Sequence, residues 1–219
     1  MYSFTTLDIA GYRGEPVPNT FLRQAEEARH LGIVLPGWGY TADRPVLYYP
    51  GLVLLNRGAD LLRVEYNYAR RPEYLAAEAD ERERWLMADV TAALEAGLAQ
   101  RTYDEITLVG KSIGTLAMGR LLSADTRLRG AHAIWLTPLL REERLLAAIQ
   151  AWAGHSLFVV GTADPHYSPP HLEAAVAATK GRQVRVEGAD HSLEIPGSAA
   201  QTVEAMGKVV RAVEMFLAS

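Results

Sequence analysis

The chain has 219 residues, is 49% hydrophobic and carries a formal net charge of −4. This content can bury one sizeable core, so we expect one domain spanning residues 1–219. The mild charge and the lack of a long basic stretch argue against nucleic-acid binding, and the absence of cysteine excludes disulfides and thiolate chemistry. Residues 1–15 have no basic head followed by an apolar core, and no apolar run approaches the ~18 residues of a membrane span. We therefore expect a cytoplasmic protein without membrane contact.

Two extended segments open the chain, at residues 4–12 and 17–25, with the turn-forming Gly14-Glu15-Pro16 between them. We expect an antiparallel hairpin at one edge of a sheet. After it, short apolar strands alternate with amphipathic helices. The expected strands are residues 31–35, 61–66, 106–109, 131–136, 156–160 and 183–186. The expected helices are residues 45–56, 73–99 (as one helix or two), 113–123, 141–152, 170–179 and the chain from 197 onward.

Strands and helices that alternate at this spacing predict an α/β fold. The sheet is then mostly parallel and doubly wound, with helices on both of its faces. The sequence contains no internal repeat, low-complexity tract or linker that would divide it.

The most informative motif is Gly110-Lys111-Ser112-Ile113-Gly114. An apolar, β-branched run ends at the first glycine, and a helical pattern starts after the serine. G-x-S-x-G in this context is typical of a sharp strand-to-helix turn that lifts a serine hydroxyl out of the sheet. Glycine permits the close packing on both sides, and the free N–H groups of the helix start favour an anion there. Ser112 is therefore the candidate nucleophile; the alternative is a glycine-rich turn with an idle serine.

Two polar residues follow later strands and supply the partners that a serine nucleophile needs. Ligands of a doubly wound sheet collect at the carboxyl ends of its strands, where we expect Ser112, Asp164 and His191. An imidazole can take and return the serine proton, and a carboxylate fixes its tautomer. The alternatives are an Asp-Pro turn for Asp164 and an ordinary loop histidine for His191. Asp190 is the rival acid, but an immediate neighbour of His191 is poorly placed to reach around the ring.

Attack on a carbonyl also requires donors for the oxyanion. The backbone N–H of Ile113, directly after the nucleophile, is the first expected donor. The second is expected in the loop Pro36-Gly37-Trp38-Gly39-Tyr40, where we choose the N–H of Trp38. The alternative for this loop is a simple turn that carries a core tryptophan.

The motifs LVGKSIGTLA, GTADPHY, GADHSLE and LPGWGY together resemble the α/β-hydrolase superfamily, and the resemblance covers the whole chain in order. The compact length is similar to the small dienelactone-hydrolase-like and esterase-like members without a cap domain. The resemblance implies a mainly parallel central sheet, a hydrolytic triad of Ser112, Asp164 and His191, and no cofactor. The chain departs from the family in having Pro36-Gly37 where the oxyanion loop often opens with His-Gly.

Residues around these positions are candidates for the substrate pocket. They are Gly37, Tyr40, Tyr66, Tyr68 and Leu193, with core packing as the alternative for the tyrosines. Arg70 and Arg71 can meet an anionic group of a substrate or belong to a solvated loop. Lys111 is either a solvated or stacking side chain or a residue that favours an anionic substrate. His166 and His171 lack the spacing of a ligand pair on one helical face, so we expect no metal.

The expected activity is that of a serine hydrolase, carboxylesterase-like, which cleaves an ester or related acyl bond of a small molecule through an acyl-enzyme on Ser112. Two alternatives stay open. One is a non-catalytic binding or scaffold protein on the same fold. The other is an acyltransferase or lyase that uses the same turn but excludes water. The oligomeric state does not follow from the sequence.

Overall fold

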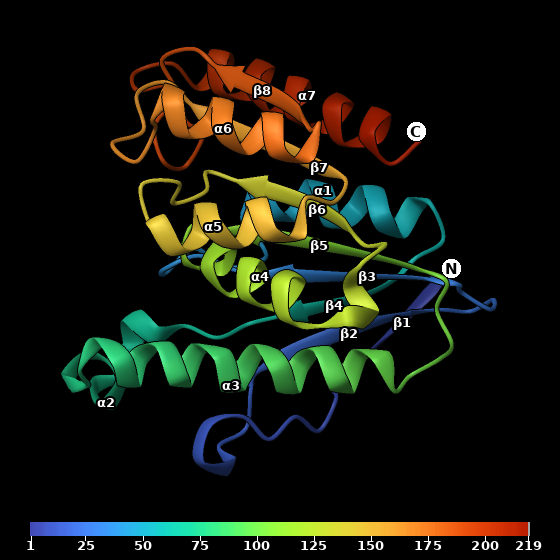
Figure 1. Cartoon of the computed structure of the whole chain (residues 1–219). Coiled ribbons are helices and arrows are strands. Elements are labelled where there is room, and N and C mark those ends of the chain that lie inside the picture. The colour runs from blue at the N-terminus through green and yellow to red at the C-terminus, as the bar shows by residue number, and fades with distance from the viewer. Residues whose placement is uncertain (219) are drawn as a thin grey trace.

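The computed structural model of the protein describes residues 1–218. Eight strands form one sheet in the order β1-β2-β4-β3-β5-β6-β7-β8 (Figure 1). They are β1 (Tyr2–Thr5), β2 (Asn19–Gln24), β3 (His30–Leu35), β4 (Asp60–Val64), β5 (Glu105–Lys111), β6 (His132–Leu136), β7 (Ser156–Gly161) and β8 (Arg182–Val186). The pairs β1–β2 and β2–β4 are antiparallel and the others are parallel. The predicted α/β class, mostly parallel sheet and antiparallel edge hairpin are thereby confirmed.

The hairpin has shorter strands and a longer connection than the sequence predicts. Its register pairs Tyr2 with Gln24 and Thr5 with Phe21. The residues between the strands fold as a loop that contains a 3₁₀ turn at Tyr12–Gly14. This loop is fastened to a distant helix, because the carboxylate of Asp89 accepts a hydrogen bond of 2.8 Å from the N–H of Tyr12. The position of this loop thus depends on a long-range contact, which a local sequence pattern does not show.

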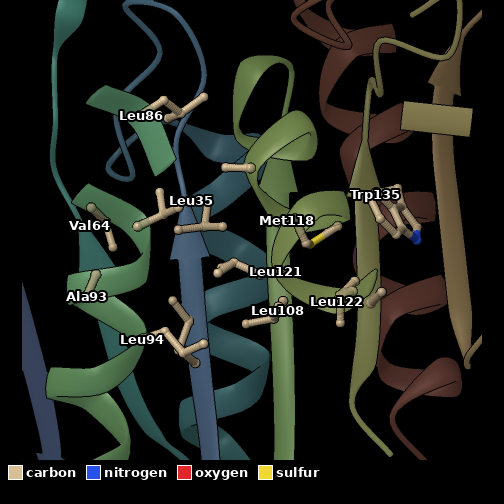
Figure 2. Packing of buried hydrophobic residues seen from close by; sticks show 14 of the residues in the cluster. Leu35, Val64, Leu86, Ala93, Leu94, Leu108, Met118, Leu121, Leu122 and Trp135 are labelled. Carbon is tan, nitrogen blue, oxygen red and sulfur yellow. The ribbon is translucent and has the colours of Figure 1, made fainter. Parts of the chain in front are cut away.

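Helices cover both faces of the sheet (Figure 1). One face carries α1 (Pro45–Asn56) and α7 (Ala199–Phe216), whose apolar residues share one core cluster. The opposite face carries α3 (Ala79–Leu98), α4 (Ile113–Ala124), α5 (Glu143–Trp152) and α6 (Pro169–Thr179) over the second cluster. Figure 2 shows Leu94 of α3 and Leu121 of α4 beside β3 and β5, where Leu35 and Leu108 lie.

The long charged segment forms two helices rather than one. The short α2 (Pro72–Ala76) comes first, and α3 begins at Ala79. Arg82 stabilises the break, because its guanidinium donates hydrogen bonds to the carbonyls of Ala77 and Leu75 at 2.8 and 3.0 Å. The segment 137–142 between β6 and α5 is short, so no cap is inserted there. No helix within residues 1–218 is both long and apolar enough to cross a bilayer.

Candidate active site

The turn between β5 and α4 places Ser112 in a strained backbone conformation, with φ 52° and ψ −120°. Residues other than glycine rarely adopt positive φ, and such strain is typical of functional sites. The flanking glycines are required by space. A Cβ on Gly114 would lie 2.4 Å from the carbonyl oxygen of Leu35, and one on Gly110 would lie 3.0 Å from that of Gly114. The G-x-S-x-G pattern thus builds a tight turn against the end of β3.

The side chains of Ser112, His191 and Asp164 form a continuous hydrogen-bonded chain. His191 Nδ1 lies 2.7 Å from Asp164 Oδ2, and His191 Nε2 lies 2.9 Å from Ser112 Oγ. Because a carboxylate only accepts, Nδ1 carries the proton and Nε2 is left to accept from the serine hydroxyl. The three residues come from the turn after β5, the loop after β7 and the loop after β8. The carboxyl ends of these strands meet at one edge of the sheet, which brings the three side chains together.

Asp164 is held in its ionised form. Its side chain is 3% exposed. Burial acts to raise the pKa of the Asp164 carboxyl, but hydrogen bonds from His191 and the N–H of His166 outweigh it, so the pKa lies below its usual value. Asp190, the rival acid, is occupied elsewhere, since its Oδ1 accepts from the N–H groups of Ser192 and Glu194. The carboxylate behind the imidazole is therefore that of Asp164.

The backbone N–H of Ile113 directly follows the serine, and that of Trp38 belongs to a loop that packs against the serine. Within the described chain, neither the N–H of Ile113 nor that of Trp38 has a hydrogen-bond partner. The neighbouring Gly37 is closed into a tight turn with Tyr40 through N–H to carbonyl contacts of 3.2 and 3.4 Å. A Cβ on Gly37 would lie 3.3 Å from Ser112 Cβ, so this loop packs directly against the candidate nucleophile. Trp38 is not a core residue: its side chain is 43% exposed and meets the ring of Tyr74 at 5.9 Å.

Tyr66 and Tyr68 lie in the core and do not form the surface of a pocket. Tyr66 is 3% exposed and Tyr68 is 1% exposed, and their rings stack at 4.6 Å. Both hydroxyls already have partners, since Tyr66 donates to the carbonyl of Pro36 at 2.9 Å and Tyr68 donates to Asp89 at 2.7 Å. This burial favours core packing, the alternative for these two tyrosines, over contact with a substrate. Tyr66 supports the loop that carries Gly37 and Trp38, and Tyr68 stacks on Tyr66.

Tyr40 and Leu193, two further candidates for the substrate pocket, line a hollow of about 400 Å³ between α1 and α7. Leu193 follows the histidine loop with a positive φ of 57°. The Tyr40 hydroxyl accepts a hydrogen bond from the N–H of Val46 at 3.2 Å, and burial raises the pKa of Tyr40 to about 12. Its ring covers the ammonium of Lys111, which lies 4.5 Å from the ring centre. Tyr40 thus serves the interior of the site as well as the wall of this hollow.

Lys111 is buried beneath the site, with 1% exposure. Its Nζ donates hydrogen bonds to the backbone carbonyl of His191 at 2.8 Å and to Thr137 Oγ1 at 3.1 Å. This position does not fit a solvated side chain or an anchor for an anionic substrate. It fits the expected stacking, since the ammonium lies over the ring of Tyr40. The contact with Thr137 has only a weak sequence signal, a threonine at the end of a strand before Pro138.

The remaining candidate residues are Arg70, Arg71, His166 and His171. The Arg71 guanidinium lies 5.8 Å from the ring centre of Trp85, and Arg70 is exposed in the turn before it. The ring of His166 is 5.1 Å from that of His191, whereas His171 shares a 2.6 Å hydrogen bond with Ser168 Oγ. Residues 1–218 contain no group of three or more His, Asp or Glu side chains arranged to hold a metal ion.

No protein-family model and no curated protein matches the sequence. Solved structures do match along almost the full chain. The chain is similar to an α/β serine hydrolase without a lid from Xanthomonas campestris, with 18% identity, a TM-score of 0.65, and coverage of 99% of this chain and 93% of that one. An esterase from Pyrococcus furiosus is 12% identical with a TM-score of 0.72, and the match covers 99% of this chain and 92% of that one. Est1E from Butyrivibrio proteoclasticus with bound ferulic acid is 12% identical with a TM-score of 0.71, and the match covers 99% of this chain and 97% of that one. The chain therefore has the α/β-hydrolase fold, in the form that lacks a lid.

Proposed function

We propose that the protein is a serine hydrolase that cleaves an ester or related acyl bond of a small molecule. The observation that carries the proposal is the hydrogen-bonded chain from Ser112 through His191 to Asp164, with 2.9 and 2.7 Å between the partner atoms. Its position at the strained turn, next to two unoccupied N–H groups, supports the same chemistry.

In the proposed reaction each residue has a role. His191 Nε2 takes the hydroxyl proton while Ser112 Oγ forms a bond to the acyl carbon. The carbonyl oxygen becomes an oxyanion, which accepts hydrogen bonds from the N–H groups of Ile113 and Trp38. When the carbon–oxygen bond to the leaving group breaks, the imidazolium returns its proton to the departing alcohol. Water then repeats the sequence on the acyl-enzyme and releases the acid, with Ser112 restored.

Asp164 works behind the imidazole. It orients the ring through the 2.7 Å contact to Nδ1 and stabilises the imidazolium that forms during each half-reaction. Its lowered pKa, set by burial and by the hydrogen bonds that outweigh it, keeps the carboxylate charged for this purpose. The same side chains would also serve transfer of the acyl group to an alcohol. An experiment that compares water with an alcohol as the acceptor distinguishes the two reactions.

Replacing Ser112 by alanine tests the proposal. Ser112→Ala is expected to abolish hydrolysis of p-nitrophenyl acetate and labelling by a fluorophosphonate probe. Ser123→Ala is the matched control, because Ser123 lies at the far end of α4 and only bonds the carbonyl of Arg120. Labelling that persists in Ser112→Ala, or is absent from the unaltered protein, would overturn the proposal. If added methanol captures most of the acyl group as its methyl ester, acyl transfer rather than hydrolysis is the activity.

A further inference from the structure

A groove of about 550 Å³ lies over the first half of α4, between α3 and α5. Figure 1 shows these three helices side by side on one face of the sheet. The floor of the groove is a stripe along α4, formed by Ile113, Leu116, Ala117 and Arg120. These positions follow the i, i+3, i+4, i+7 pattern and therefore share one face of the helix. Nothing in the sequence distinguishes this stripe from an ordinary core-facing one.

One end of the groove is formed by Ile113, the residue after Ser112. Ile113 lines it and is also the residue whose N–H lies next to Ser112, at the N-terminus of α4. Tyr74 of α2, which contacts the exposed Trp38, forms part of the same wall. We infer that an acyl group whose carbonyl reaches Ser112 extends past Ile113 toward the groove.

Apolar side chains line the walls of the groove between the charged ones. α3 contributes Leu86 and Met87, and α5 contributes Leu145. Met87, Leu116 and Ile113 are only partly buried, so their apolar surface faces the groove. Covering such surface with hydrocarbon is favourable, because each buried methylene adds a roughly constant free energy.

The charged residues at the rim are mostly paired with one another or with the backbone. Glu83 bonds both Arg120 and Arg144, at 2.6 and 3.0 Å. Arg82 is occupied by the carbonyls that close the break before α3. Glu142 adds a further negative charge at the rim. An anionic tail would have to compete with Glu83 for its arginines, so an uncharged tail fits the groove better.

The length of the floor sets the size of the ligand. Ile113 and Arg120 are separated by seven positions on α4, which gives about 10 Å along the helix, the extended length of roughly eight carbons. We propose that the groove binds the uncharged hydrocarbon chain of a medium-chain acyl group, of about six to ten carbons. The assignment of the carbonyl to Ser112 rests on the proposed function; binding of the chain in the groove does not.

The chain-length dependence of hydrolysis tests the proposal. We expect kcat/KM for p-nitrophenyl esters to rise about two- to fourfold per methylene from acetate to about octanoate, and then to level off or fall. Leu116→Trp, which fills the groove from α4, should lower the octanoate-to-acetate ratio of kcat/KM at least tenfold. Met87→Trp fills it from α3 and should do the same. Because each variant is compared with itself, partial misfolding does not change the ratio.

Val203→Trp is the matched control, since Val203 is 72% exposed and lines the separate hollow between α1 and α7. This variant should leave the ratio unchanged. A flat profile in the unaltered protein, or a ratio that falls in Val203→Trp and not in the two groove variants, overturns the proposal.

Binding separates this proposal from the failure of the proposed function. Octanoate should bind to Ser112→Ala protein, and the addition of Leu116→Trp should weaken that binding at least tenfold, as measured by titration calorimetry. This result would support the groove even if no ester were hydrolysed. Absence of octanoate binding, or equal binding by both proteins, would reject the groove while leaving hydrolysis of short esters intact.

Discussion

The ammonium of Lys111 donates a 2.8 Å hydrogen bond to the backbone carbonyl of His191. Lys111 is the residue before Ser112, so this contact joins the loop of the imidazole to the strand that ends at the serine. A second hydrogen bond, to Thr137 Oγ1, adds the end of β6. One buried cation therefore ties together three of the chain segments that surround the site.

Replacing Lys111 by methionine should lower kcat about tenfold, because a hydrogen bond from a charged donor contributes ~1.5–3 kcal/mol and the histidine loop loses it. Thermal stability should change little, since methionine fills the space and avoids the cost of burying a charge. The measurement is ester hydrolysis together with a melting curve. Thr137→Val removes only the weaker partner and should have a smaller effect. Equal kcat for Lys111→Met and the unaltered protein would contradict this role.

The stability of the protein should also report the titration of Lys111. Burial lowers the pKa of Lys111 from its ordinary value of 10.5 to about 8, with Asp164 and Asp190 opposing the shift. Between these two pH values the unfolded chain binds more protons than the native protein, so the contribution of Lys111 to the free energy of unfolding rises with pH. It is constant below about pH 8.

Urea unfolding of the unaltered protein and of Lys111→Met, at several pH values from 7 to 10.5, measures this contribution. The difference between their unfolding free energies should move in favour of the unaltered protein above about pH 8. Tyrosines with raised pKa values titrate in both proteins, so their effect cancels in the difference. A difference that stays flat would show that burial does not lower the pKa of Lys111 in the native protein, and one that moves the other way would show that this pKa is raised.

The strand-to-helix turn at Ser112 and the alternation of strands and helices were predictable because both are local patterns. The apolar run before Gly110 and the two glycines suffice to predict the turn. The roles of Tyr66 and Tyr68 were not predictable, because a tyrosine after a strand can face either a cleft or the core. Long-range partners, Pro36 and Asp89, decide that direction.

The burial of Lys111 was also not predictable from the sequence. A lysine beside a turn is usually solvated, but β5 lies between β3 and β6 in the centre of the sheet. Helices cover both faces there, so even a charged side chain at the end of the strand is buried. The groove over α4 was equally hidden, since its floor has the spacing of an ordinary core stripe and only the arrangement of α3 and α5 leaves it open.

Asp164→Asn should lower kcat by about 10³ to 10⁴, because the amide keeps the shape of the side chain but no longer stabilises an imidazolium or selects the required tautomer. The effect on stability depends on pH. The pKa of Asp164 lies below its usual 3.8, since the hydrogen bonds from His191 and His166 outweigh the effect of burial. The stabilisation is therefore present above about pH 4 and is lost as the pH falls through the native pKa.

Acid unfolding checks this prediction. The advantage of the unaltered protein over Asp164→Asn in unfolding free energy should shrink as the pH falls below about 4. The matched variant Asp190→Asn should retain far more activity, because Asp190 only bonds the N–H groups of its own loop. A greater loss of kcat in Asp190→Asn than in Asp164→Asn would reverse the assignment of the acid.

Gly114→Ala should destabilise the protein by more than about 3 kcal/mol and abolish ester hydrolysis. The added methyl group would lie 2.4 Å from the carbonyl oxygen of Leu35 and 2.7 Å from that of Pro36, and neither backbone atom can move without shifting the loop of Trp38. Gly130→Ala is the control, since no atom lies within 4 Å of its added Cβ. Chemical denaturation of the two variants measures the contrast, and similar stabilities would refute the steric argument.

Tyr66→Phe should lower kcat about five- to tenfold and leave KM nearly unchanged. Its hydroxyl donates to the carbonyl of Pro36, which holds the loop that carries Trp38, the proposed oxyanion donor. Burial raises the pKa of Tyr66, so the hydroxyl remains a donor. An interaction that serves the transition state alone affects kcat rather than substrate binding. Tyr103→Phe removes a comparable hydrogen bond, to Asp60 at 2.9 Å, near the opposite end of the sheet. Tyr66→Phe should lose about 1 kcal/mol of stability, and Tyr103→Phe should lose at least as much because its partner is a carboxylate. A loss of kcat in Tyr66→Phe alone therefore separates positioning of the proposed oxyanion loop from a general loss of stability.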